Sequence, residues 1–155
     1  MLQEVTLSPE IWESARERRR IEFRVCLEGL RRASAFDPLL TRLELRLDES
    51  ALHLRGLTAQ GELLADICLP REALAPLTRE YLEIIDQLGD SRRALGLSRM
   101  EALDMAKKAV HDRAGRLLLR RCRALGFDLD SARRLFSLWV ALSSDTTRLG
   151  EPVTH

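Results

Sequence analysis

Residues 41–50 have the sequence TRLELRLDES, in which hydrophobic residues recur at every second position. Leu43, Leu45 and Leu47 alternate with charged residues, which is typical of a β-strand with one buried face and one solvated face. The next residues, Asp48-Glu49-Ser50, favour a turn. Because a strand that ends in a tight turn pairs with the strand that follows it, these residues predict the start of a meander.

Two further strands follow this turn. Leu52 and Leu54 continue the alternation, and residues 58–61, with the sequence TAQG, indicate a second turn. The inner face of the third strand is expected to consist of Leu63, Ala65, Ile67 and Leu69. Because short turns join antiparallel neighbours, the sequence predicts a three-stranded antiparallel meander with one solvated face.

The chain before the meander has the periodicity of a helix. Ser8 and Pro9 have the residue types of an N-cap and a first helical position, and we expect the helix to run to about Ser34. Its buried stripe is predicted to contain Phe23, Cys26, Leu27 and Leu30. Residues 5–7 are compatible with a short edge strand ahead of this helix.

The segment after the meander returns to helical periodicity. Apolar residues recur at helical spacing from Leu74 to Leu88, and Pro76 is compatible with the first turn of this helix. Gly89-Asp90 is expected to end it. A second, longer helix is predicted from about Ser98 to about Arg123.

Gly126 is expected to stop the long helix, and Asp128 or Asp130 to cap a last one. Residues 143–155 are polar and are expected to form a flexible tail. The order of one helix, a three-stranded meander and three helices predicts a single α+β domain of two layers over residues 1–142.

The composition bounds the class of protein. The chain has 155 residues, of which 45% are hydrophobic and 32% are charged, as in one globular domain. The formal net charge of +1 argues neither for nor against a polyanionic partner. All basic residues except Lys107 and Lys108 are arginines, which GC-rich codon usage explains most simply.

The cysteines and the termini indicate the compartment. Cys26, Cys68 and Cys122 are isolated, so we expect buried thiols in a reducing compartment. The first residues lack the apolar core of a signal peptide, and no stretch approaches the roughly 18 apolar residues of a membrane span. We therefore expect a cytoplasmic protein without membrane contact. No glycine pattern for phosphate binding is present, and no cofactor is expected.

Several stretches resemble one protein family. They are Glu101-Ala102-x-Asp104-Met105 with His111 six residues later, Asp128-x-Asp130-Ser131-Ala132-Arg133-Arg134-Leu135-Phe136, and the tyrosine of Arg79-Glu80-Tyr81. With these motifs and a Phe36-Asp37-Pro38 corner, the chain is identified as a divergent member of UPF0262, an uncharacterised bacterial family. The resemblance covers about residues 4–142. It implies a shared fold and no particular activity.

The long helix carries the first candidate site. Glu101, Asp104, Lys108 and His111 are spaced 3, 4 and 3, which aligns them on one helix face. Asp104 and Lys108 suit an i,i+4 ion pair. If a carboxylate orients His111, the imidazole could act as a general base beside Tyr81. A solvated polar stripe is the alternative.

Neither a nucleophile nor a metal site accompanies these residues in the sequence. No serine or cysteine has a recognisable base near it along the chain. The three histidines also lack the ligand-spaced neighbours of a metal site, so no metal is expected.

Basic residues form the second candidate site. Arg113, Arg116, Arg120 and Arg123 also recur at spacings of 3, 4 and 3, which fits phosphate contacts with nucleic acid. The scarcity of aromatic residues for base stacking argues against this interpretation. Arginines near a helix C-terminus also complement the helix dipole. Nucleic acid is therefore the less favoured partner.

The start of the last helix is a third candidate. Asp128, Asp130, Arg133 and Arg134 could bind a ligand or a partner, together with Lys108. The same acidic residue types are also what a helix start needs as caps. We expect at least one of the two arginines to pair with a carboxylate, because the positive end of the helix dipole disfavours cations.

Three functions follow as hypotheses. The leading one is a small non-catalytic module that binds a protein partner or itself, because no catalytic set is recognisable and the edges of a meander invite strand pairing. The second is an enzyme or small-ligand site on the face of Glu101, Asp104 and His111. The third is nucleic-acid binding through the arginine stripe.

Overall fold

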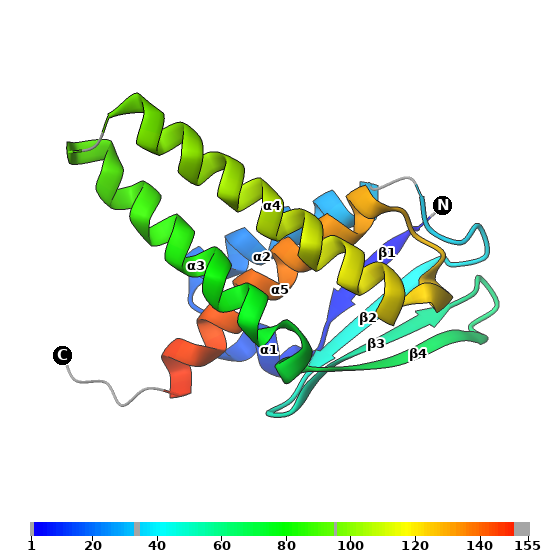
Figure 1. Ribbon diagram of the computed structural model, residues 1–155. Coiled ribbons are helices and arrows are strands. Elements are labelled where there is room, and N and C mark those ends of the chain that lie inside the picture. Colours follow the sequence, from blue (N-terminus) through cyan, green and yellow to red (C-terminus); the bar gives the residue numbers. More distant parts are fainter. Residues whose placement is uncertain (1, 33–34, 95, 151–155) are drawn as a thin grey trace.

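The computed structural model describes residues 2–32, 35–94 and 96–150, and it shows helices packed on one face of a four-stranded sheet (Figure 1). The predicted α+β class with two layers is confirmed. Alternation in the two central strands explains this layering. Leu43, Leu45, Leu52 and Leu54 are buried against the helices, whereas Arg42, Arg46 and Arg55 face water.

The sheet has one strand more than the predicted meander. The strands are β1 (Glu4–Leu7), β2 (Arg42–Leu47), β3 (Ala51–Leu57) and β4 (Leu63–Pro70), in that spatial order. β2, β3 and β4 are antiparallel neighbours as predicted. β1 pairs with β2 in parallel, because the helical connection between them returns the chain to the same end of the sheet.

A bulge changes the predicted inner face of β4. Gly56 pairs with Ala65, whereas the next residue of β3, Leu57, pairs with Leu63. The shift moves Leu63 out of the inner row, so the side chain of Leu63 is exposed, although Ala65 and Leu69 are buried as expected.

The predicted first helix is two helices. α1 (Pro9–Ser14) ends at Ala15, which has an extended backbone, and α2 (Glu17–Arg32) begins two residues later. Nε of Arg20 donates to the main-chain oxygen of Trp12, 2.9 Å away, and so pairs a carbonyl at the end of α1. The predicted end at Ser34 lies outside the described residues.

The predicted cap of the first helix differs in detail. Ser8 occupies the N-cap position and Pro9 the first helical position, as expected. The hydroxyl of Ser8 makes no cap hydrogen bond, because the N–H of Ile11 donates to the main-chain oxygen of Ser8 instead.

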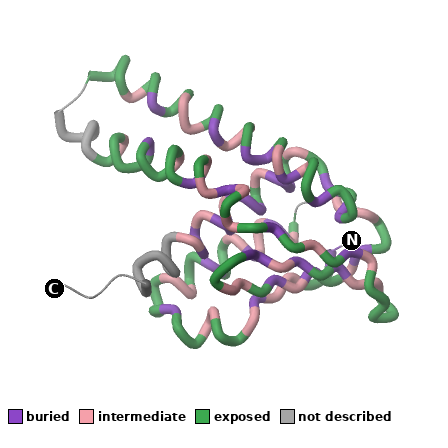
Figure 2. Tube along the Cα trace, turned by 60° about the horizontal axis from the view of Figure 1, so that its bottom comes forward, coloured by how far each residue is buried: buried purple, intermediate pink, exposed green. Residues whose placement is uncertain are grey.

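Two long helices follow the sheet. α3 (Arg71–Ala94) continues past Gly89-Asp90, which were expected to end it, and it contains Pro76 in its interior. α4 (Leu97–Arg121) is unbroken. The two helices form a hairpin (Figure 1). A single glycine within a helix costs only about 1 kcal/mol, which is too little to end α3. Exposed residues predominate on the part that extends away from the sheet (Figure 2).

The last helix is longer than predicted. After the 3-10 helix η1 (Arg123–Leu125), Gly126 stops the chain in a left-handed conformation with φ 59°, and α5 (Leu129–Gly150) follows. Residues 143–150, expected as part of a flexible tail, therefore continue the helix. Residues 151–155 of that predicted tail lie outside the described residues.

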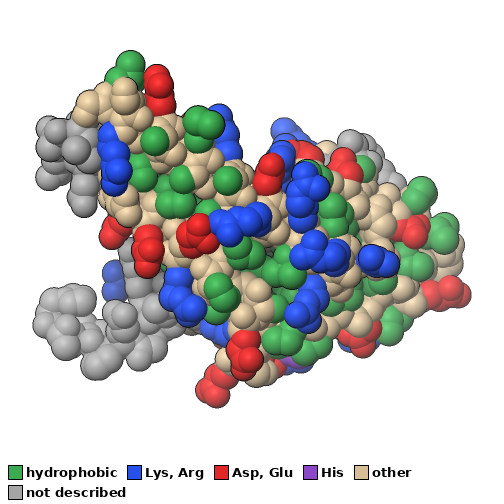
Figure 3. Space-filling view, in the orientation of Figure 1, with side chains coloured by type: hydrophobic (Ala, Val, Ile, Leu, Met, Phe, Trp, Pro, Cys, Tyr) green, Lys and Arg blue, Asp and Glu red, His purple; other side chains and the backbone are tan. Residues whose placement is uncertain are grey.

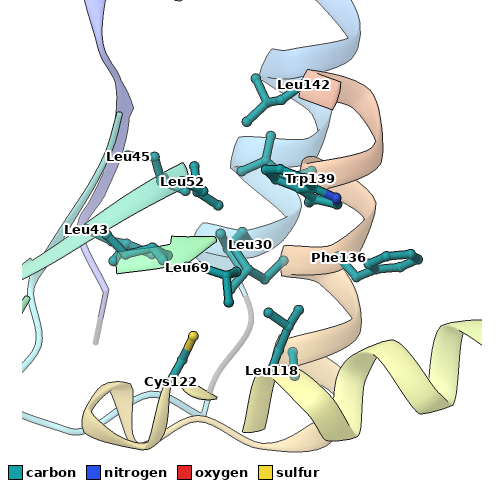
Figure 4. Packing of buried hydrophobic residues seen from close by; sticks show 14 of the residues in the cluster. Leu30, Leu43, Leu45, Leu52, Leu69, Leu118, Cys122, Phe136, Trp139 and Leu142 are labelled. Carbon is teal, nitrogen blue, oxygen red and sulfur yellow. The ribbon is translucent and has the colours of Figure 1, made fainter. Parts of the chain in front are cut away.

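The core lies between the sheet and helices α2 and α5 (Figure 4). Leucines of β2, β3 and β4 meet Leu30 of α2 and Trp139 of α5. The three cysteines are free, but only Cys122 is buried; Cys26 is half-buried and Cys68 is exposed on β4. The prediction of three buried thiols is thus wrong for Cys68, because its position faces the solvated side of the sheet.

Candidate functional site

His111 of α4 contacts a serine of α5. Its Nε2 atom lies 3.0 Å from the Oγ atom of Ser137, which is 26 residues later in the chain. The same Oγ atom lies 3.3 Å from the main-chain oxygen of Arg133. The two helices approach closely because Gly115 has no Cβ; a Cβ there would lie 3.0 Å from Cδ1 of Leu129.

Two aromatic rings enclose the imidazole of His111. The ring of Tyr81 stacks on it with 5.9 Å between centroids, and the ring of Phe136 meets it edge-on at 5.6 Å. Burial lowers the pKa of His111, and the positive charges of Arg133 and Lys107 lower it further. The neutral imidazole therefore dominates at neutral pH. Burial also raises the pKa of Tyr81.

Ion pairs join the three helices around this cluster. Arg133 of α5 pairs with Asp112 of α4, and Nη2 of Arg113 on α4 lies 2.6 Å from Oε1 of Glu80 on α3. Because these side chains are partly exposed, each pair contributes at most about 1 kcal/mol. The two pairs link α4 to α3 and to α5 on either side of His111.

An open cleft of about 720 Å³ lies beside Ser137 and Tyr81. α5 supplies its more buried lining residues, Ser137, Val140 and Ala141, whereas α2 and α3 line its sides. Its volume lies within the range of roughly 300–1,000 Å³ that is common for binding sites. Ser137 and Tyr81 thus belong both to the histidine cluster and to the cleft.

The sides of the cleft combine apolar and charged side chains. Leu82 and Ile85 of α3 are exposed apolar residues there. Carboxylates outnumber guanidinium groups among the lining residues, which include Glu22, Glu83, Asp86, Arg19 and Arg79. Nη1 of Arg19 lies 2.8 Å from Oε2 of Glu22. The cleft is therefore amphipathic, and its charged rim has three carboxylates and two guanidinium groups.

The thiol of Cys26 also lines the cleft. Burial raises its pKa, and the neighbouring carboxylate of Glu22 raises it further. Burial likewise raises the pKa of Cys122 to about 11. Both groups are therefore thiols at neutral pH, and the thiolate that a cysteine nucleophile requires is disfavoured.

The structure does not bring Glu101, Asp104 and Lys108 to His111. Oδ2 of Asp104 lies 3.4 Å from Nζ of Lys108, so the predicted i,i+4 ion pair is confirmed. All three side chains are exposed, whereas His111 is half-buried and bonded to Ser137. The first three residues of the predicted stripe thus form a solvated face.

The residues at the start of α5 make local contacts. Oδ1 of Asp128 accepts hydrogen bonds from the N–H of Ser131 at 2.9 Å and from its hydroxyl at 2.7 Å, which confirms the predicted cap. These bonds lower the pKa of Asp128. Nε of Arg134 lies 3.1 Å from Oδ2 of Asp130. Both arginines therefore pair with a carboxylate, as expected for at least one of them.

Three of the four arginines in the predicted stripe lie on α4. Arg116 and Arg120 are exposed on α4, and Arg113 is exposed beside Glu80. Arg123 lies in η1, beyond the end of α4, so the regular spacing does not extend to it. In Figure 3, Lys and Arg side chains gather on the face that includes α4.

Neither a metal site nor a membrane span is found in the part of the chain that the structure describes. No group of three or more His, Cys, Asp and Glu side chains could hold a metal ion there. No helix among these residues is both long and apolar enough to cross a membrane.

Ser137 is the site residue that the sequence analysis missed. It lies on α5 next to buried Phe136, and its contact with His111 depends on how α4 and α5 cross. No spacing along the chain indicates such a crossing. The cleft was missed for the same reason, because its lining comes from three helices that are far apart in the sequence.

The fold and the site define a class of protein, namely a small two-layer α+β domain whose helical layer bears an open amphipathic cleft. A family model described as an uncharacterised protein family, UPF0262, matches residues 1–145, and the chain belongs to this family. Three stretches that carry the resemblance meet at the site, because Tyr81, His111 and Phe136 pack against one another. No solved structure matches this chain.

Curated relatives have the same family name. A UPF0262 protein of Jannaschia sp. (strain CCS1) is 33% identical over 98 residues, which are 63% of this chain and 63% of the relative. One of Dinoroseobacter shibae is 31% identical over 80 residues, or 51% and 50% of the two chains. One of Cereibacter sphaeroides is 30% identical over 108 residues, or 69% and 67%. The chain thus spans about half to two thirds of these relatives' lengths.

Proposed function

We propose that this protein is a small non-catalytic interaction module of the cytoplasm that binds a helical segment of a protein partner in the cleft between α2, α3 and α5. The observation that carries the proposal is the amphipathic lining of this cleft, with exposed Leu82 and Ile85 beside a charged rim in which carboxylates outnumber guanidinium groups. The free thiol of Cys68, which is exposed, is consistent with a reducing compartment.

The shape and lining of the cleft favour a helix as its occupant. An amphipathic helix binds by laying apolar residues at positions i, i+3, i+4 and i+7 into an apolar groove. Here Ile85, Val140 and Ala141 offer apolar surface from two helices. Because the cleft is open to solvent, it suits a segment of a larger protein better than a small compact ligand.

The charges of the rim indicate the chemistry of the partner. Glu83 and Asp86 are exposed on the α3 side of the cleft, and Glu22 lies on the α2 side. Arg19 and Arg79 also lie on the rim, but the carboxylates are more numerous. Lysine or arginine residues that flank the apolar stripe of the partner would complement this rim.

The surroundings of Ser137 favour binding over nucleophilic catalysis. Ser137 is in the interior of α5, where the main-chain N–H groups are engaged in the helix and are not free to stabilise an oxyanion. Its hydroxyl is near both His111 and the main-chain oxygen of Arg133. The contact therefore supports a positioning role for this pair in the wall of the cleft.

Site-specific photocrosslinking in the host cell tests the proposal. A benzophenone amino acid at position 85 should yield a discrete protein adduct, and the crosslinked peptide should contain apolar residues at helical spacing with flanking Lys or Arg. The substitution Glu83→Lys should weaken this adduct several-fold, because it reverses one charge of the rim.

The matched control carries the same probe at position 46. Arg46 is exposed on the opposite, solvated face of the sheet, so it should not capture the same protein. The proposal fails if position 85 gives no adduct, or if positions 85 and 46 capture the same set of proteins.

A further inference from the structure

β4 forms one edge of the sheet. It is eight residues long, whereas the strand at the other edge, β1, has four. Its sequence, LLADICLP, contains a single charged residue, Asp66. Natural edge strands are commonly protected by charged residues, by a short length or by a covering segment. β4 has a bulge near Leu63 and Pro70 at its other end, which are also protective features. The residues between them are mostly apolar, so this central part resembles a strand that pairs with another chain.

The register with β3 shows which main-chain groups of β4 point outward. The N–H of Arg71 donates to the main-chain oxygen of Ser50 at 3.0 Å, and these residues continue the β3–β4 register. In an antiparallel pair the hydrogen-bonding direction alternates along the strand. Leu69 and Ile67 therefore bond toward β3, and the N–H and C=O groups of Cys68 and Asp66 point to the open edge.

We infer that β4 pairs antiparallel with β4 of a second copy of this chain, and that the two sheets join into one eight-stranded sheet about a two-fold axis. The axis is perpendicular to the sheet, so the helical layers of both copies lie on the same side. Such an isologous contact uses one surface twice and closes at two copies.

One register of the two β4 strands pairs the outward-pointing main-chain N–H and C=O groups best. With Ile67 opposite Ile67 of the second copy, Asp66 lies opposite Cys68 and the two residues exchange both of their main-chain hydrogen bonds. Ile67 is half-buried in the single chain and lies opposite Leu54 of β3, on the face of the sheet that the helices cover. In the pair of chains it would pack against Ile67 of the second copy.

The neighbouring registers are less favourable. A register centred on Asp66 places the two Asp66 carboxylates opposite each other, where like charges repel. A register centred on Cys68 places Asp66 opposite Pro70, which has no N–H to donate. The side chains of β4 therefore favour self-pairing in a single register.

The solution mass of the full chain tests the inference. Light scattering coupled to size exclusion should give twice the chain mass of 17.7 kDa for the wild type. The substitution Cys68→Pro should return the mass to that of one chain, because it removes an outward N–H without breaking a hydrogen bond to β3. The control Cys68→Ser keeps this N–H and should remain a dimer.

Circular dichroism of the Cys68→Pro variant should show wild-type helix content, which separates loss of pairing from loss of folding. A wild type that stays at one chain mass over the whole concentration range overturns the inference. So does a Cys68→Pro variant that is folded and still dimeric.

A disulfide scan tests the register independently. In a background with Cys26→Ser and Cys68→Ser, the substitution Ile67→Cys should give a covalent dimer on mild oxidation, because directly opposed residues on the axis are within disulfide reach. Asp66→Cys in the same background should not. Crosslinking at position 66 in place of position 67 overturns the register. Because β4 does not line the cleft, the outcome is independent of the proposed partner site.

Discussion

Folding changes the chemistry of His111 by placing it against Tyr81, Phe136 and Ser137. The neutral form is favoured because burial, and then the charges of Arg133 and Lys107, lower its pKa. The unfolded chain has no such environment, so its histidine titrates near the ordinary value of about 6.5. This difference links the protonation of one residue to the stability of the whole domain.

The expected consequence is a loss of stability in mild acid. As the pH falls from about 6.5 toward the lower pKa of the folded state, the unfolded chain binds the proton first, and the free energy of unfolding decreases. In urea titrations at pH 7.5 and 5.5, the wild type should lose more stability than His111→Gln. This extra loss of stability should be smaller than the roughly 1.4 kcal/mol per pH unit that the uptake of one full proton on unfolding would give, because His111 is half-exposed.

The wild type and His111→Gln both contain His53 and the same carboxylates, so the effects of these groups on the pH dependence of stability cancel in this comparison. Equal losses for wild type and His111→Gln would contradict the prediction, as would a His111 resonance in NMR that titrates at 6.5 or above.

Residues also differ in how far their partners can be predicted. The ion pair of Asp104 with Lys108 and the cap by Asp128 join residues three or four positions apart, and helical spacing predicts both. The contact between His111 and Ser137 depends on the crossing of two helices, which no local rule determines. The predicted pairing of His111 with a carboxylate on its own helix was therefore not what the fold produced.

At the scale of elements, strong periodicity predicted the element types, and tertiary contacts set the boundaries. The strict alternation of residues 41–47 located β2, and Gly126 stopped the chain before α5 as expected. The break at Ala15 and the continuation of α3 past Gly89 were not predicted. Ala15 is buried in the core, which local periodicity does not indicate. Gly89 is exposed, and the cost of about 1 kcal/mol for one glycine within a helix is too small to end it.

The connection between η1 and α5 illustrates how one position can determine an element boundary. Gly126 has a positive φ of 59°, and a Cβ there would lie 3.1 Å from the main-chain nitrogen of Asp37. That nitrogen donates to the main-chain oxygen of Leu125 at 2.9 Å, so Asp37 has little room to move. Both the backbone conformation and the close approach therefore require glycine.

Gly61 provides a matched comparison, because it has a φ of 80° and open space around its Cα. Gly61→Ala should lower the free energy of unfolding only by the cost of a positive φ for alanine, roughly 1–2 kcal/mol. Gly126→Ala should lose at least about 1 kcal/mol more, because the methyl group also meets the chain at Asp37. Equal unfolding free energies for the two variants in guanidinium titrations would show that the loop at Asp37 yields without loss.

At the scale of the whole molecule, the buried residues fall into two clusters. The larger one joins the sheet to α2, α4, η1 and α5. The smaller one, with buried Ile84, Leu103 and Val110, lies within the hairpin of α3 and α4. The far part of this hairpin extends away from the sheet, so it is stabilised mainly by the smaller cluster (Figure 1). A small cluster of this kind can open without unfolding the larger one.

Hydrogen exchange should separate the two clusters. Leu103→Ala removes a side chain of the smaller cluster, and the amides of the distal parts of α3 and α4 should exchange faster, while those of β3 keep their protection. Leu118→Ala, in the larger cluster, should lower protection throughout the molecule by about 2–5 kcal/mol. If Leu103→Ala lowers the protection of β3 as much as that of the hairpin, the two clusters unfold as one unit.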